Sequence, residues 1–279
     1  TSEISIKDYN DATGSFTVVV PEPQSASGVS SVLVPVWCSE DQSDICWYST
    51  KHQSDGTYTV SVDPINHKYN SGLYKIHVYV VSNNGIQQNV GTASQMVSAT
   101  QYYTIMGDTT VTIDQMMRCF ESSGHAYPSA ALGVGGASTL EQFCLLYLEE
   151  AHAEGVRAEV AFAQAMKETG WLQYGGIVQI DQFNFAGIGA LDGNSSGNCA
   201  SFPDVRTGIR AQIQHLKAYA SNEALVNAQV DPRFHLVTMG SAPYVEWLGQ
   251  KENPTGAGWA TSTNYGYSIV SMIRQIKLL

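Results

Sequence analysis

The sequence predicts a two-domain protein, in which a small antiparallel β-sandwich precedes a mostly α-helical domain with a small irregular lobe. Three observations support this fold class. The chain has 279 residues, a length typical of two domains. Residues 13–100 contain short β-branched and aromatic runs, and the sequence after about residue 104 contains runs with helical periodicity. We therefore expect domains at residues 1–103 and 104–279.

Five strands are expected in the first domain, each a short apolar run bounded by turn-rich segments such as EDQSD and SNNG. They are SFTVVVP (15–21), SVLVPVW (31–37), DICWYS (44–49), TYTVSVD (57–63) and LYKIHVYVV (73–81). Several of these runs alternate between apolar and polar residues, which is typical of half-buried strands. Short strands at this spacing indicate an antiparallel sandwich.

Four helices are expected in the second domain. The first spans 138–155, opening with a capping box of Ser138 and Glu141 and closing at Gly155. The second, 157–169, is apolar nearly all round and should be central and buried. The others are TGIRAQIQHLKAYA (207–220) and GYSIVSMIRQIKLL (266–279). The Gly- and Asn-rich stretch 175–201, between the second and third helices, should form the irregular lobe.

Composition limits the possible functions. The formal net charge is −11, with nine acids and four bases in residues 1–100 and sixteen and ten in residues 101–279. Both parts are acidic and carry no basic stripe, so we expect no nucleic-acid partner. No apolar run reaches the length of a bilayer span, so we expect no membrane insertion. A neutral or weakly charged substrate suits this balance.

No cofactor or metal is expected. The histidines form no H-E-x-x-H, and DGNSSG (192–197), which begins like a calcium loop, has Pro203 at the twelfth position. GNSSG (193–197) lacks the flanking strand and helix of a nucleophile elbow. The five cysteines include no C-x-x-C, and the sequence leaves open whether Cys38 and Cys46 form a disulfide. The start, TSEISIKDYN, has neither an initiator methionine nor a signal sequence, so we expect a monomeric fragment of a longer, secreted polypeptide.

Glu168 is the main candidate for chemistry. It falls in the last turn of the helix 157–169, close in sequence to Trp171. The negative end of a helix disfavours ionisation of a carboxyl group, and burial against an indole acts in the same direction. Glu168 would then stay protonated near neutral pH, as a general acid requires. The alternative is a solvated glutamate with no role at a helix end.

The first domain resembles a known module in three segments: VPVWCSEDQSDICWYST, DGTYTVSVD and GLYKIHVYVVSNNG. They are similar to the GBS-Bsp-like repeat, an immunoglobulin-like module found beside cell-wall hydrolases, and the match covers nearly all of residues 1–100. The resemblance implies a wall-associated accessory module. Trp37, Trp47 and Tyr48 could form a sugar platform, but for the tryptophans we favour core packing.

The second domain resembles a family of enzymes. EVAFAQAMKETGW followed by FNFAGIGA is similar to the motif of bacterial endo-β-N-acetylglucosaminidases (glycoside hydrolase family 73), peptidoglycan hydrolases with a lysozyme-like fold. The match runs from about residue 115 to the end. It implies that Glu168 is the catalytic acid beside Trp171. It also implies that Asn184, Phe185 and Gly187 line the substrate cleft, together with Tyr265 from WATSTNYGYS.

A glycosidase normally uses two carboxylates. Candidates for the second are Asp181, Asp192 and Asp204, of which Asp204 has the offset most like the family. An aspartate directly before a helix is also a common N-cap, which is the structural alternative for Asp204. The N-acetyl group of the substrate is a further alternative, acting as an internal nucleophile.

We therefore expect a secreted, wall-associated hydrolase that cleaves the β-1,4 bond after N-acetylglucosamine in peptidoglycan. Phe185 and Tyr265 are expected to stack on sugar rings, and Asn184 to hydrogen-bond an N-acetyl group. The enzymatic alternatives are a lytic transglycosylase and a muramidase. The alternative from another class is a non-catalytic wall-binding protein.

Overall fold

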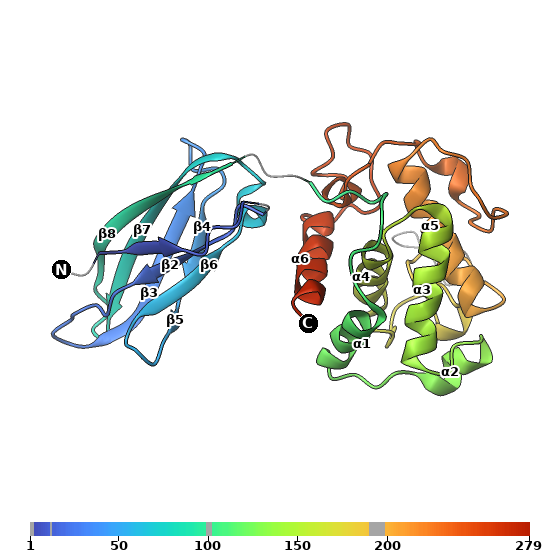
Figure 1. Cartoon of the computed structure of the whole chain (residues 1–279), viewed down its shortest axis with the longest axis horizontal. Helices are drawn as coiled ribbons and strands as arrows, with labels where there is room; N and C mark the ends of the chain where they lie inside the picture. The colour runs from blue at the N-terminus through green and yellow to red at the C-terminus, as the bar shows by residue number, and fades with distance from the viewer. Residues whose placement is uncertain (1–2, 12, 99–101, 190–198) are drawn as a thin grey trace. The chain divides into compact units, whose positions relative to one another are not determined.

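The structure is a computed structural model that describes residues 3–11, 13–98, 102–189 and 199–279. The chain divides into two compact units, Thr1–Tyr102 and Tyr103–Leu279. The first unit is built of antiparallel β-strands, and the described part of the second contains six α-helices (Figure 1). This order of a β part and a helical part is the one that the sequence predicts.

The first unit consists of two four-stranded antiparallel sheets, with strand orders β1-β2-β6-β5 and β4-β3-β7-β8. The strands are β1 (Ser5–Lys7), β2 (Phe16–Val20), β3 (Val29–Trp37), β4 (Cys46–Ser49), β5 (Lys51–His52), β6 (Tyr58–Val62), β7 (Gly72–Ser82) and β8 (Gln87–Val97). The five expected runs are β2, β3, β4, β6 and β7. The other three were not predicted, because β1 and β5 are very short and β8 is mostly polar, formed by its backbone pairing along β7.

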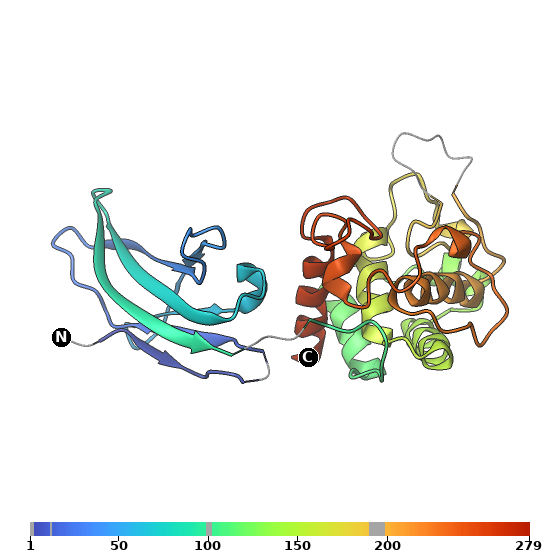
Figure 2. The same cartoon turned by 90° about the horizontal axis from the view of Figure 1, so that it is seen from above.

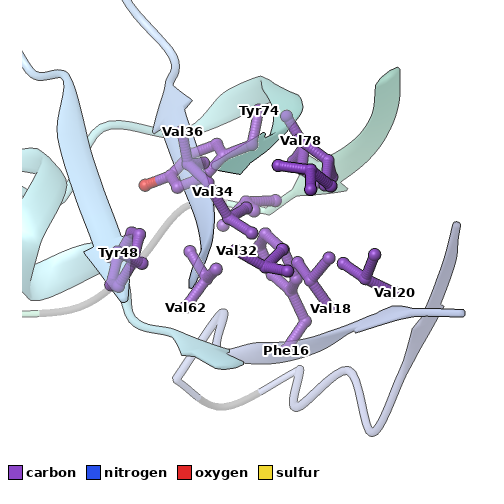
Figure 3. Close-up of a cluster of buried hydrophobic side chains, with 13 residues drawn as sticks. Phe16, Val18, Val20, Val32, Val34, Val36, Tyr48, Val62, Tyr74 and Val78 are labelled. Atoms are coloured by element: carbon purple, nitrogen blue, oxygen red, sulfur yellow. The ribbon is translucent and has the colours of Figure 1, made fainter. Parts of the chain in front are cut away.

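The core of this unit lies between the two sheets. Alternate residues of β2, β3 and β7 point inward, and Val32 and Val34 of one sheet face Val18 and Val62 of the other (Figure 3). Figure 2 shows the two sheets as separate layers. The rings of Phe16 and Tyr74 meet edge to face across the core, with their centroids 6.1 Å apart.

The two tryptophans of this unit differ in burial. Trp37 is 7% exposed and lies edge-on to His77, so this residue is buried as expected, although it lies outside the cluster between the two sheets. For Trp47 the same prediction is wrong, because its side chain is 51% exposed. Strand alternation places both side chains on the outer face of their sheet, since Val36 and Tyr48 take the inward positions beside them. There the ring of Trp47 lies against Tyr79, with the centroids 5.6 Å apart. Cys38 and Cys46 are both free thiols.

The helices of the second unit are α1 (Ile113–Ser122), α2 (Ser129–Val134), α3 (Leu140–Glu154), α4 (Ala158–Thr169), α5 (Val205–Ala220) and α6 (Tyr265–Lys277). α4 is the central helix, as expected, and packs against α1, α3, α5 and α6 (Figure 1). Within the described residues, no helix is both long and apolar enough to cross a bilayer.

Two details differ from the sequence predictions. The capping box of α3 is formed by Thr139 and Gln142, one residue later than Ser138 and Glu141, while the left-handed C-cap at Gly155 is as predicted. Helices α1 and α2 were not predicted. α1 begins with its own capping box of Thr112 and Gln115, the same kind of signal that marks α3.

The position of α6 brings two distant parts of the chain together. Its first turn packs on the short helix Val245–Leu248, where a Cβ on Gly266 would lie 2.0 Å from the carbonyl oxygen of Val245. Only glycine permits this approach, which brings the start of α6 close to the end of α4. Residues Gly249 and Ala260 then pair as a parallel bridge and fix the segment that precedes α6.

Candidate active site

Glu168 lies in the last turn of α4, which ends at Thr169 with Gly170 as its left-handed cap. Its side chain opens into a cavity of about 600 Å³. The cavity is lined by Lys167, Glu168, Ala186, Gly187, Gln250, Trp259, Ala260, Thr261, Ser262 and Tyr265. A second cavity of about 240 Å³, lined in part by Thr169, Tyr174 and Asn184, shares Glu168 and Gly187 with the first. Solvent therefore reaches Glu168 through a cavity that is large enough for a sugar ring.

The pKa of Glu168 is raised above its ordinary value of 4.5, because the protein atoms around the carboxyl group desolvate its charged form. A hydrogen bond from Tyr265 and the ammonium group of Lys167 act in the opposite direction, but they do not outweigh the desolvation. The side chain as a whole is accessible, whereas its carboxyl oxygens are held against Tyr265 and Gly187. The carboxyl group is therefore a weaker acid than a solvated glutamate.

A chain of buried hydrogen bonds sets the direction of the bond between Tyr265 and Glu168. The Nε2 group of Gln212 donates to the carbonyl of Ala161 (2.8 Å) and to Oε1 of Gln164 (3.0 Å). Since a carbonyl oxygen only accepts, this contact fixes the orientation of the Gln212 amide and hence that of Gln164. Nε2 of Gln164 then donates to the hydroxyl oxygen of Tyr265 (3.0 Å).

It follows that the single hydroxyl proton of Tyr265 points to Oε1 of Glu168. The pKa of this phenol is raised well above its ordinary value, chiefly by burial and also by the neighbouring Glu168 charge, so it stays a neutral donor. With Oε1 accepting this bond, the acidic proton of Glu168 belongs on Oε2. Tyr265 is thus a partner of the candidate acid, and its ring is only 3% exposed.

Gly187 leaves space beside Oε2 of Glu168. A Cβ at this position would lie 3.6 Å from that oxygen, and the backbone φ of +65° is one that glycine adopts easily. Asn184 holds the same loop. Its Nδ2 donates to the carbonyls of Ile188 and Ala200, and its Oδ1 accepts from two backbone N–H groups of the loop. The Asn184 side chain therefore positions Gly187 and has no group left for an N-acetyl substituent.

Two residues expected in the cleft occupy other places. Phe185 is fully buried and packs edge-on against Phe143, with a centroid distance of 5.3 Å, so the expectation that it stacks on a sugar is corrected. The ring of Trp171 packs against Phe120, and Trp171 is absent from the described residues that line either cavity at Glu168. Its backbone N–H instead caps α4 at the carbonyl of Met166. Core packing and helix capping account for both residues.

Two of the three aspartates considered as second carboxylates, Asp181 and Asp204, are absent from the described cavity wall. Oδ1 of Asp204 accepts a hydrogen bond of 2.7 Å from the backbone N–H of Thr207, so this residue is the N-cap of α5. Asp181 lies exposed in the short helix Ile180–Gln182. Asp192 falls outside the described residues. Among the described residues that line the cavity, Glu168 is the only carboxylate.

Sequence reasoning missed another part of the cavity wall, which consists of Gln250, Trp259, Ala260, Thr261 and Ser262. The backbone N–H of Trp259 donates to Leu248 and that of Gln250 to Ala260, and these bonds hold this segment in place. The tryptophan beside the expected Tyr265 in GWATSTNYG was the available signal. Trp259 offers an aromatic surface in the cavity, the role that we had expected of Phe185.

Comparisons with known proteins bear on both units. Residues 5–95 match the family model described as GBS Bsp-like repeat. Residues 144–278 match the family model described as Mannosyl-glycoprotein endo-beta-N-acetylglucosaminidase. Both the family and the order of the two modules are those that the sequence predicts. The second match is a similarity to a family of glycoside hydrolases.

An uncharacterised protein of Borreliella burgdorferi is 48% identical over 130 residues, which cover 47% of this chain and 59% of that protein. A polysaccharide deacetylase from Bacillus cereus is 11% identical with a TM-score of 0.30, covering 60% of this chain and 66% of the deacetylase. A family 76 glycoside hydrolase from Bacteroides thetaiotaomicron is 13% identical with a TM-score of 0.25. The match covers 62% of this chain and 35% of that hydrolase. Structural similarity at this level establishes no shared fold.

Proposed function

We propose that the chain is a peptidoglycan hydrolase that cleaves the β-1,4 bond after N-acetylglucosamine, with Glu168 as its general acid. The family match over residues 144–278 supports the reaction class. The observation that carries the proposal is the carboxyl group of Glu168, which opens into a cavity and has a raised pKa. In this proposal the helical unit is a lysozyme-like domain and the β unit an immunoglobulin-like accessory module, both secreted and wall-associated.

The first step is proton transfer from Oε2 of Glu168 to the glycosidic oxygen, beside the space that Gly187 leaves open. The bond between C1 and this oxygen breaks, and its electron pair stays on the departing oxygen. Glu168 becomes negatively charged as this happens. The hydrogen bond from Tyr265 to Oε1 then becomes charge-assisted, so it stabilises the transition state more than the ground state.

The second group in this mechanism is the N-acetyl carbonyl oxygen of the substrate, which attacks C1 from the opposite face. Substrate-assisted hydrolysis of this kind needs one protein carboxylate, and Glu168 is the only one among the described residues of the cavity wall. Water then adds to C1 and returns a proton to Glu168, which restores the acid. Replacement of Asp192 by asparagine checks this step, because activity should persist if no aspartate attacks.

The rival functions make different demands on the site. A lytic transglycosylase or a muramidase would also use Glu168 as an acid, and these enzymes differ in the sugar end that they produce. A non-catalytic wall-binding protein would need no carboxyl group with a raised pKa in its cavity. The geometry at Glu168 therefore favours an enzyme.

The test is Glu168→Gln, which keeps the size and the acceptor for Tyr265 but has no transferable proton. We expect turnover of peptidoglycan to fall by about two orders of magnitude or more, the scale of lost general acid catalysis. Glu141→Gln, at an exposed position in the first turn of α3, is the matched control and should keep full activity. Wild-type turnover in a folded Glu168→Gln variant would remove the assignment.

A further inference from the structure

A side cavity of about 180 Å³ adjoins the candidate active site and has no role in the mechanism above. Its wall includes Gly187, His215, Arg233, Leu236, Val237 and Trp259. Gly187 and Trp259 also line the cavity of Glu168, so the two spaces are neighbours on either side of these residues. A substituent of a sugar bound at Glu168 could therefore enter the side cavity.

His215 is held rigidly in this wall. Its Nδ1 lies 2.7 Å from Oδ2 of Asp231, a carboxylate with no exposed surface. The imidazole packs edge-on against Trp259 (4.5 Å between centroids) and Tyr219 (5.5 Å). Oε1 of Gln214 accepts the backbone N–H of Asp231 and so fixes the acid behind the imidazole. Nε2 of His215 has no hydrogen-bond partner among the described residues.

Arg233 supplies the charge of the side cavity. It follows Asp231 by two residues, and its backbone N–H donates to Oδ1 of that carboxylate. Its guanidinium forms no ion pair within the described parts of the chain, although the chain carries a net charge of −11. A guanidinium binds a carboxylate or a carbonyl oxygen through its planar set of donors. Leu236 and Val237 add an aliphatic wall beside it.

We propose that this side cavity binds the lactyl substituent of the amino sugar on the leaving side of the scissile bond. This substituent is joined to the sugar by an ether and ends in a carboxyl or amide group, whose oxygen Arg233 contacts. The inference rests on the proposed function, because cleavage after N-acetylglucosamine places N-acetylmuramic acid on that side. Its lactyl group offers a methyl group to Leu236 and Val237 and an oxygen to Arg233. That oxygen belongs to a free carboxylate in a strand without peptides, and to an amide when a peptide stem is attached.

Calorimetric titration of the Glu168→Gln protein tests this site without cleavage. Three soluble ligands are compared: an N-acetylglucosamine tetramer, a peptidoglycan tetrasaccharide with free lactyl groups, and the same tetrasaccharide with peptide stems. Adding Arg233→Gln should raise Kd for at least one lactyl ligand about tenfold, the scale of one charge-assisted hydrogen bond. Binding of the N-acetylglucosamine tetramer should stay within about twofold.

The two lactyl ligands separate the two sources of the acyl oxygen. If Arg233→Gln weakens binding of the free lactyl ligand alone, Arg233 binds a carboxylate. If it weakens binding of both lactyl ligands, Arg233 binds the acyl oxygen whether or not a peptide is attached. Arg118→Gln is the matched control, since Arg118 is exposed and paired with Asp114 on α1. Arg233→Lys keeps the charge without the planar donor set and should fall between the wild type and Arg233→Gln.

The proposal is overturned if Arg233→Gln weakens all three ligands equally, or weakens none of them, in a protein that melts as the wild type does. If the Glu168→Gln protein with Arg233 intact binds neither lactyl ligand, the proposal is overturned as well. Failure of the proposed function is a separate result, namely a wild-type protein that cleaves no peptidoglycan. The titration remains readable in that case because it measures binding alone.

Discussion

Hydrogen-bond direction at single residues determines what Glu168 can do. The amides of Gln212 and Gln164 each have one orientation that satisfies their neighbours, and the second of them leaves Tyr265 as a donor to Glu168. Sequence reasoning found Glu168 and Tyr265 through short motifs. It could not find the two glutamines, because a buried glutamine shows no sequence signal of its partners. It also assigned Phe185 to the cleft, since a motif does not reveal which of its side chains face the core.

The first prediction concerns Tyr265→Phe. Desolvation raises the pKa of Glu168, and the Tyr265 hydroxyl lowers it, so loss of this hydroxyl should raise the pKa further. A general acid works in its protonated form, and kcat/KM therefore falls as the pH rises through this pKa. We expect the alkaline limb of the profile of kcat/KM against pH to move to higher pH in Tyr265→Phe. We also expect kcat at the optimum to fall roughly tenfold or more, as one charge-assisted hydrogen bond is lost.

Gln164→Met is the companion variant for this experiment. It keeps Tyr265 but removes the donor that orients its proton, so the limb should move in the same direction by a smaller amount. A shift of the alkaline limb to lower pH in either variant would contradict the hydrogen-bond direction from Tyr265 to Glu168.

The second prediction separates the two roles considered for Asp204. Asparagine caps a helix as well as aspartate does, whereas alanine costs about 1 kcal/mol of stability. Because Asp204 caps α5, Asp204→Asn should keep both melting temperature and activity, and Asp204→Ala should lower the melting temperature alone. If Asp204 were the second catalytic carboxylate, Asp204→Asn would lose activity by orders of magnitude with its stability intact.

At the scale of elements, a buried ion pair between Lys217 and Glu154 joins α3 to α5. Glu154 of α3 has no exposed side-chain surface and accepts hydrogen bonds from Lys217 Nζ (2.9 Å) and from the backbone N–H groups of Val226 and Asn227. Burial alone would raise the pKa of Glu154. The two N–H groups and Lys217 outweigh burial and hold the pKa below 4.5. This carboxylate therefore fixes both the helix pair and the loop that follows α5.

The third prediction follows from the lowered pKa of Glu154. A group whose pKa is lower in the folded state contributes stability above its unfolded pKa and loses it as the pH falls through the folded one. Glu154→Gln should lower the free energy of unfolding at neutral pH by about 3 kcal/mol, because it leaves Lys217 buried without its partner. The difference from the wild type should shrink as the pH falls below 4.5 in urea unfolding experiments. An equal difference at all pH values would contradict this account.

The sequence predicted elements well where their signals are local. Capping residues, apolar stripes and glycine stops identified α3, α4, α5 and α6, and alternation identified the buried strands. β8 was missed because its stability comes from pairing with β7 and its side chains are largely polar. The cavity wall at Gln250 and residues 259–262 was missed because backbone bonds that close one irregular loop place it, from Trp259 to Leu248 and from Gln250 to Ala260. Such bonds leave no periodicity in the sequence.

For the whole molecule, the two compact units predict independent folding. The segment 103–279 contains Glu168, Tyr265 and all the described residues of the cavity wall. We expect a fragment of these residues to fold cooperatively, which thermal unfolding followed by circular dichroism checks. It should also cleave soluble glycan strands at the rate of the whole chain, whereas an unfolded fragment would show that the β unit is needed for stability.

The central claim is that Glu168 protonates the oxygen on the leaving side of N-acetylglucosamine and that water completes the reaction. Its most direct test is analysis of the sugar ends of digested peptidoglycan by borohydride reduction and mass spectrometry. The account predicts new reducing ends of N-acetylglucosamine, produced by the wild type and not by Glu168→Gln. Ends of N-acetylmuramic acid or of 1,6-anhydro sugar, or no new ends at all, would contradict it.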